Sequence, residues 1–147
     1  MSQTETQLAM EYMFILKSTD SAVFYPGNSA ASFKIKLYTP LTLTGSWKVA
    51  LTGFHLKDVK GEIPYSLLIH SPLCKNLSIV GGDKQLAVLK HIVRPEKRDS
   101  WVFDSPVYLP VNQTFLETLE IYITDGSGKA LSFQSGTSHC SLHLIQE

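Results

Sequence analysis

The chain has 147 residues, of which 44% are hydrophobic, and its 13 basic and 13 acidic residues give a formal net charge of zero. This length allows one domain with a sizeable core, and this composition excludes a wholly disordered chain. A neutral chain also lacks the overall positive charge of a nucleic-acid-binding protein, and no apolar run reaches the roughly 20 residues of a membrane span, so we expect neither kind of binding.

The N-terminal residues 1–10 carry no apolar period that a fold would bury, which predicts a flexible arm before a single domain of residues 11–147. The arm lacks the basic and apolar regions of a secretory signal. The two cysteines, Cys74 and Cys140, are far apart in the sequence and fit reduced thiols. We therefore expect a protein that is made in the cytoplasm or nucleus and is not secreted.

Short strand-like runs follow one another from residue 12 onward, with turn residues between most of them. Residues 32–38 alternate apolar and polar side chains, and residues 47–54 form a second run of strand length. The expected core residues of these two runs are Phe33, Ile35, Leu37, Trp47, Val49 and Leu51. Further runs lie at residues 12–17, 67–70, 77–80, 86–93, 101–103 and 141–145, and residues 85–91 also fit one or two turns of helix.

The last third of the chain carries the clearest local pattern. Residues 117–124 alternate with a period of two, as in a strand that is buried on one face. Leu119, Ile121 and Ile123 are its expected core residues, and Thr124 points to the opposite face. A reversal follows at Asp125, Gly126, Ser127 and Gly128. The chain then returns in a second strand, in which Phe133 is expected in the core.

The spacing of these runs predicts the class of fold. No segment sustains the 3.6-residue apolar period of a long helix, and the runs recur at intervals of roughly 8–12 residues. An all-β fold of antiparallel strands is therefore predicted, either a sandwich or a barrel. Most aromatic residues alternate with Val, Ile or Leu, which favours core packing over a surface on which bases or sugars stack.

Chemically active residues do not form a catalytic pattern. His139 and His143 share one face of a strand while Cys140 points to the other face, and a closed zinc site needs four convergent ligands. No nucleophile elbow and no phosphate-binding loop occurs in the sequence. We therefore predict a protein that is not an enzyme and that holds neither a metal nor a cofactor.

Three blocks of residues, taken together and in order, resemble a known family. The first block joins residues 24–28 to Phe33, Leu37 and residues 43–54, the second covers residues 76–93, and the third covers residues 108–144. In this order and spacing, the blocks resemble the small jelly-roll capsid proteins of Maverick/Polinton-type elements and of the related adintovirus-like DNA viruses. The resemblance covers about residues 12–147.

The resemblance implies a single antiparallel jelly-roll β-sandwich with two sheets of about four strands. It also implies a structural protein of the virion, namely a penton-like vertex or minor capsid subunit. Such a subunit forms a cyclic homo-oligomer, with a pentamer favoured, and contacts the major capsid protein, with a fibre or a host receptor as a further partner. The alternative is a jelly-roll binding module or a spike or fibre base that recognises a glycan, a peptide or a host receptor.

Turns at the ends of a sandwich are expected to meet neighbouring subunits or axial partners. The residues expected in such contact loops are Pro26, Gly27, Asn28, Gly81, Gly82, Asp83, Asp125, Gly126, Ser127 and Gly128.

Overall fold

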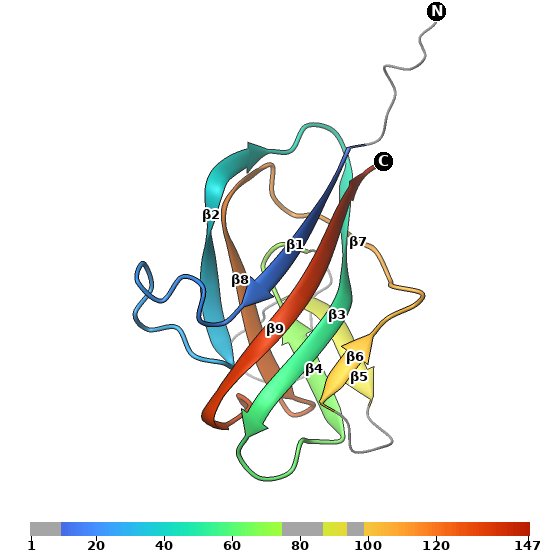
Figure 1. Ribbon diagram of the computed structural model, residues 1–147. Helices are drawn as coiled ribbons and strands as arrows, with labels where there is room; N and C mark the ends of the chain where they lie inside the picture. Colours follow the sequence, from blue (N-terminus) through green and yellow to red (C-terminus); the bar gives the residue numbers. More distant parts are fainter. Residues whose placement is uncertain (1–9, 75–86, 94–98) are drawn as a thin grey trace, which may run out of the picture.

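The computed structural model describes residues 10–74, 87–93 and 99–147, and all regular elements in these residues are β-strands (Figure 1). The strands are β1 Glu11–Lys17, β2 Ser32–Thr42, β3 Trp47–Val59, β4 Ser66–His70, β5 Val88–Val93, β6 Ser100–Val102, β7 Leu109–Pro110, β8 Phe115–Asp125 and β9 Phe133–Gln146. The predicted all-β class is confirmed. Residues 1–9 of the predicted arm, the predicted run at 77–80 and the turn at Gly81, Gly82 and Asp83 lie outside the described residues.

The strands form two antiparallel sheets that face each other. Sheet A has the order β1-β9-β3-β6, with the short β7 also paired to β3, and sheet B has the order β2-β8-β4-β5. The chain crosses between the sheets after β1, β2, β3, β5, β7 and β8. This strand order is that of a jelly roll, in which two Greek keys are wrapped into a sandwich. The predicted jelly-roll sandwich with about four strands in each sheet is therefore confirmed.

The core lies between the two sheets. Leu37 and Phe133 are only partly buried, since Leu37 lies in the irregular stretch of β2 between Lys36 and Leu41 and Phe133 is the first residue of β9. The other residues expected in the core are buried: Phe33, Ile35, Trp47, Val49, Leu51, Leu119, Ile121 and Ile123. Trp47 is further fixed because its indole Nε1 donates to the Thr44 carbonyl at 2.8 Å.

The strand β9 is longer than the sequence predicts. The return strand that carries Phe133 and the run at residues 141–145 are parts of one continuous strand, which pairs with β3 along most of its length. Gly136 makes this possible at an irregularity of β3, because a Cβ on it would lie 1.7 Å from the Lys57 carbonyl oxygen. Asp58, beside that carbonyl, has a φ of 57°. Sequence reading missed this continuity because residues 134–137 are polar or small and resemble a loop.

The region at residues 85–91, for which both helix and strand fitted the sequence, forms part of the strand β5 from residue 88 onward. Leu89 and Ile92 of β5 are buried, and β5 pairs with β4 at the edge of sheet B. The described part of this region therefore follows the strand interpretation.

Candidate interaction surface

The β1–β2 loop covers the free edge of β2. Asn28, in the predicted contact loop, donates from Nδ2 to the Lys34 carbonyl at 2.8 Å and accepts at Oδ1 from the Lys34 N–H at 2.9 Å. The Lys36 N–H donates to Oγ of Ser21 at 2.9 Å. These side chains take the place of a neighbouring strand, because they bond backbone groups that an edge strand otherwise leaves unpaired. The loop therefore closes this edge.

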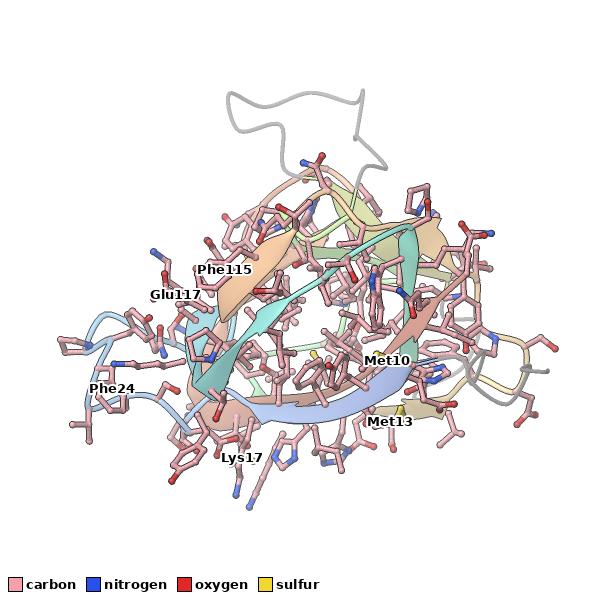
Figure 2. All side chains as sticks on the ribbon, turned by 90° about the horizontal axis from the view of Figure 1, so that it is seen from above. Met10, Met13, Lys17, Phe24, Phe115 and Glu117 are labelled. Atoms are coloured by element: carbon pink, nitrogen blue, oxygen red, sulfur yellow. The ribbon has the colours of Figure 1, made fainter. Side chains whose placement is uncertain are left out.

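The same side of the sandwich exposes large apolar side chains. Val23 and Phe24 in the loop are 92% and 60% exposed, and Tyr38 on β2 is fully exposed. The Lys36 ammonium lies 4.5 Å from the centroid of the Phe24 ring, a cation–π contact. Figure 2 shows Phe24 at the outer end of this loop. This side of the sandwich is therefore a candidate interaction surface.

The predicted turn at residues 125–128 is held by its first residue. The Asp125 carboxylate accepts hydrogen bonds from the Ser127 N–H at 2.9 Å, the Ser127 hydroxyl at 2.6 Å and the Lys129 N–H at 3.0 Å. Burial raises the pKa of Asp125, but these hydrogen bonds and the Lys129 charge outweigh it and hold the pKa below its usual value. Gly128 adopts a φ of 92°, which permits the reversal.

The residues after this turn explain one departure from the sequence pattern. Thr124 was expected to face outward, yet it is buried. The chain folds back so that the Leu131 N–H donates to the Ile123 carbonyl, and Ala130 bridges to Thr124. The Thr124 hydroxyl lies 2.9 Å from Nε2 of His70. The outward side of β8 is therefore covered at this end by its own turn.

The structure brings both described contact loops to the same end of sheet B. Ser32, where β2 begins, is the register partner of Tyr122, near the end of β8, and the Ile123 N–H donates to the Ala31 carbonyl. The loop at residues 26–28 therefore precedes β2 at the end where the turn at residues 125–128 follows β8.

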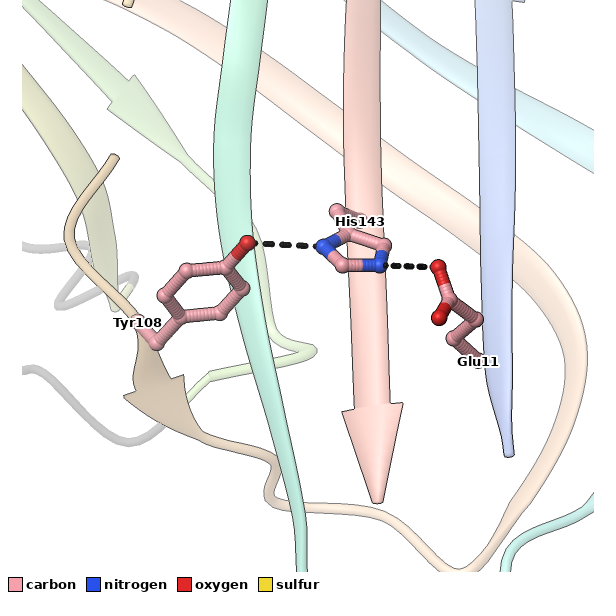
Figure 3. Close-up of polar contacts among 3 residues, drawn as sticks. All are labelled: Glu11, Tyr108 and His143. Atoms are coloured by element: carbon pink, nitrogen blue, oxygen red, sulfur yellow. Dashed lines mark hydrogen bonds and ion pairs between the residues drawn. The ribbon is translucent and has the colours of Figure 1, made fainter. Parts of the chain in front are cut away.

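A chain of three polar side chains crosses the outer face of sheet A (Figure 3). Nδ1 of His143 lies 2.7 Å from the Tyr108 hydroxyl, and its Nε2 lies 2.9 Å from a carboxylate oxygen of Glu11. The three residues come from β9, the segment before β7 and β1. A neutral imidazole fits both contacts when it accepts from the tyrosine and donates to the carboxylate. The arrangement ties the edge strand β1 to β9 and to the segment before β7.

A second pair of histidines lies on the same face. His55 and His139 are register partners on β3 and β9, with ring centroids 5.7 Å apart. Burial lowers the pKa of His139, and the nearby His55, Lys17 and Lys57 lower it further, against a smaller opposing effect of Asp20. The sequence-based expectation that His139 and His143 share a face, opposite to buried Cys140, agrees with this geometry.

The described residues offer no cluster that suits a metal ion or a reactive thiol. Within residues 10–74, 87–93 and 99–147, no three His, Cys, Asp or Glu side chains gather closely enough to bind a metal. The thiols of Cys74 and Cys140 are both buried, and burial raises the pKa of Cys140 far above its usual value. The same part of the chain contains no helix that is long and apolar enough to cross a membrane.

One pocket of about 300 Å³ lies at the opposite end of the sandwich from the two contact loops. It is lined by residues 45–47, residues 110–114 and Glu147. Its walls are the first residue of β3, the last residue of β7, loop residues and Glu147, and no histidine or cysteine is among them. Sequence reading did not find this pocket, because its walls come together only through the pairing of β3, β7 and β9.

The two outermost strands of sheet A, which have a free edge among the described residues, carry apolar side chains on its outer face. Met13 and Ile15 on β1 are 60% and 77% exposed, and Val102 on β6 is 80% exposed. Figure 2 shows Met13 pointing away from the sandwich. The strand order places β1 and β6 at opposite edges of the sheet. Both edges of one sheet are thus apolar on the same face.

The strand order defines a class of protein, the jelly-roll sandwiches, and comparisons with known proteins do not narrow that class. No family model matches the chain, and no curated protein matches it. One similar solved structure is the VP2 subviral particle of infectious bursal disease virus, with 10% identity and a TM-score of 0.27 over 93% of this chain and 33% of that chain.

Another similar structure is that of the Gx strain of infectious bursal disease virus, with 14% identity and a TM-score of 0.24 over 94% of this chain and 31% of that chain. The chain therefore spans about a third of the length of the two chains it matches. At scores this low, the likenesses say nothing about what this chain does.

Proposed function

We propose that the protein is a structural capsid subunit of the virion, of the penton-like or minor kind that the family resemblance implies. In this role it forms a cyclic homo-oligomer, favoured as a pentamer, and contacts the major capsid protein. The observation that carries the proposal is the position of the exposed apolar side chains. They occur at both free edges of sheet A and on the β2 side of the sandwich.

A ring needs two different surfaces on each subunit, because each copy meets its neighbours head to tail. The jelly roll supplies two such sides: β1 and β2 belong to one, and β5 and β6 to the other (Figure 1). Val93 and Val102, on β5 and β6, are 51% and 80% exposed, so the second side is also apolar. A formal net charge of zero limits repulsion between copies that pack side by side.

The test is the absolute mass of the untagged protein by light scattering after size exclusion, with negative-stain images of the peak. A ring of identical subunits supports the proposal, and five-fold symmetry supports the pentamer. A stable monomer at high concentration that also fails to enter particles with the major capsid protein would overturn the structural role.

A second candidate function is a binding module or the base of a spike or fibre. The exposed aromatic side chains of Phe24, Tyr38 and Phe115 favour it, because aromatic surfaces on sandwich ends suit glycans and peptides. A trimer in the same measurement, or a specific binder on a glycan array, would support this candidate. Neither result would alter the jelly-roll fold.

A further inference from the structure

The edge strand β1 leaves a regular set of backbone groups unpaired among the described residues. The Ser18 N–H donates to the Ser138 carbonyl and the Gln146 N–H donates to the Met10 carbonyl, so the even-numbered residues of β1 face β9. Glu11, Met13 and Ile15 therefore direct their N–H and C=O groups away from the sheet. No other described strand pairs with this side of β1.

Lys17 closes this edge at one end. Its N–H donates to the Asp20 carboxylate at 3.1 Å, and its carbonyl accepts from the Asp20 N–H at 2.9 Å. The usable edge is therefore the stretch from Glu11 to Ile15. The side chains of its odd-numbered residues lie on the outer face, because Tyr12, Phe14 and Leu16 pack against the core.

The opposite edge of sheet A, formed by β6, is unpaired in the same way within the described residues. The Leu56 N–H donates to the Asp99 carbonyl at 2.8 Å and the Phe103 N–H donates to the Thr52 carbonyl at 3.0 Å. These bonds turn the odd-numbered residues of β6 toward β3. Val102 and its neighbour Ser100 therefore direct their backbone groups outward, and both side chains lie on the outer face.

The backbone groups and side chains of the two edges alternate in the same way. On each edge the residues with free backbone groups are the ones whose side chains lie on the outer face, which a direct antiparallel pair of residues requires. The alternating pairings of sheet A also make β1 and β6 antiparallel to each other. A rotation about an axis along the strands keeps that relation between neighbouring copies.

We propose that β1 of one copy pairs with β6 of the next copy, so that sheet A continues from subunit to subunit around the ring. The proposal rests on the proposed cyclic homo-oligomer and names the surfaces that build it. In this arrangement the exposed apolar side chains of one edge contact those of the other edge. The contact is head to tail, so it produces a ring of copies and not a closed two-fold pair.

The available backbone groups select the register. The strand β6 directs only Ser100 and Val102 outward, and the usable part of β1 ends at Ile15 because Lys17 is already bonded to Asp20. Pairing Met13 with Val102 and Ile15 with Ser100 uses both residues of β6, and it brings the exposed side chains of Met13 and Val102 together. The register shifted by two residues, with Ile15 opposite Val102, would place Ser100 opposite Lys17. The proposed register therefore pairs Met13 with Val102.

The main competing arrangement is a two-fold pair in which β1 of one copy joins β1 of another. Its backbone groups and side chains also alternate in the same way, and it would cover Met13 and Ile15. It leaves Val102 exposed, however, and it cannot extend beyond two copies. A test must therefore distinguish the use of β6 from the use of β1 alone.

Disulfide cross-linking makes this distinction. Residues directly opposite in a hydrogen-bonded antiparallel pair have Cα atoms about 5.5 Å apart, which suits a disulfide. The double variant Met13→Cys with Val102→Cys, oxidised at low concentration, should give a ladder of linked species up to the number of subunits in the ring. The wild-type protein is a control because Cys74 and Cys140 are buried, and Tyr38→Cys is a control for any exposed thiol.

Each outcome decides the proposal. A ladder that requires both substitutions supports the pairing of β1 with β6. A linked dimer from Met13→Cys alone, with none from Val102→Cys and no ladder, would overturn it in favour of the two-fold pair. If light scattering shows a ring but the double variant stays unlinked, this pairing is wrong while the proposed function stands. A monomer that neither links nor enters particles would remove both.

Discussion

The two edge strands on one side of the sandwich, β1 and β2, differ in whether a loop covers their outer edge. The edge of β2 is covered: Asn28 holds both backbone groups of Lys34, Ser21 accepts from Lys36, and the strand carries an irregularity between Lys36 and Leu41. The edge of β1 has no such cover among the described residues, and it carries Met13 and Ile15 on its outer face.

The difference indicates which edge is available to a partner. Lysines, irregularities and covering loops are the means by which proteins prevent edge strands from pairing with other chains. The side chains on β2 follow that pattern, with Lys34 and Lys36 pointing outward. A bare and apolar edge on β1, beside a protected one on β2, is typical of a strand that is paired in its assembled state.

The largest expected loss of stability comes from a substitution in the core that supports both strands. Ile121 is fully buried on β8 and is the register partner of Phe33 on β2. Ile121→Asp places an unpaired carboxylate there, so it should cost more than about 4 kcal/mol of unfolding free energy or prevent folding. Urea unfolding measures this, with Thr118→Asp as the control, because Thr118 lies on the outward face of β8 opposite Lys36. A variant that unfolds at the wild-type urea concentration would contradict the inward placement of Ile121.

The next effect should weaken β1 more than β2. Trp47 is buried, and its ring stacks on Tyr12 of β1 with centroids 5.6 Å apart. Trp47→Ala should lower the unfolding free energy by about 3–5 kcal/mol, because it leaves a large cavity. Hydrogen exchange should show greater loss of protection in β1 than in β2. Trp47→Phe keeps a ring against Tyr12 and should cost less, and equal losses in both strands would contradict the expected asymmetry.

A smaller loss of stability is expected when the edge of β2 is uncovered, so that it becomes unpaired like the edge of β1. Asn28→Ala removes both hydrogen bonds to Lys34, which should cost about 1 kcal/mol and leave this edge unpaired. We expect this variant to associate more strongly with rising concentration, as light scattering would show. Asn28→Asp is the matched control, since it keeps the acceptor for the Lys34 N–H and replaces the donor with a charged carboxylate oxygen. Unchanged association in Asn28→Ala would mean that the loop does not protect β2.

The fold was largely readable from the sequence because the information is local. A period of two fixes which side chains of a strand face inward, and Ile121 and Val49 follow it. The identity of the edges was not readable, because it depends on which distant strands pair. The continuity of β9 depends on Gly136 meeting Lys57, and the contact between His143 and Glu11 joins residues 132 positions apart. Nothing near either residue in the sequence predicts these contacts.

The smallest expected effect is a pH dependence confined to the β1 side. Burial, His55 and the lysines at positions 17 and 57 lower the pKa of His139, so the folded protein disfavours the charged imidazole. The unfolded chain then binds more protons as the pH falls below about 6.5, and stability is lost from that pH down to the folded-state pKa. The loss should stay below about 1 kcal/mol, because the imidazole is partly solvated.

The variant His139→Gln should remove this part of the pH dependence, while His91→Gln on sheet B should retain it. Urea midpoints at about pH 7.5 and about pH 5.5 measure the difference for the three proteins. Lys17 of β1 is the register partner of His139, whereas the described register partners of β2 on β8 include no histidine. Acid should therefore speed hydrogen exchange in β1 more than in β2. An equal response in both strands would contradict the expectation that protonation of His139 destabilises β1 in particular.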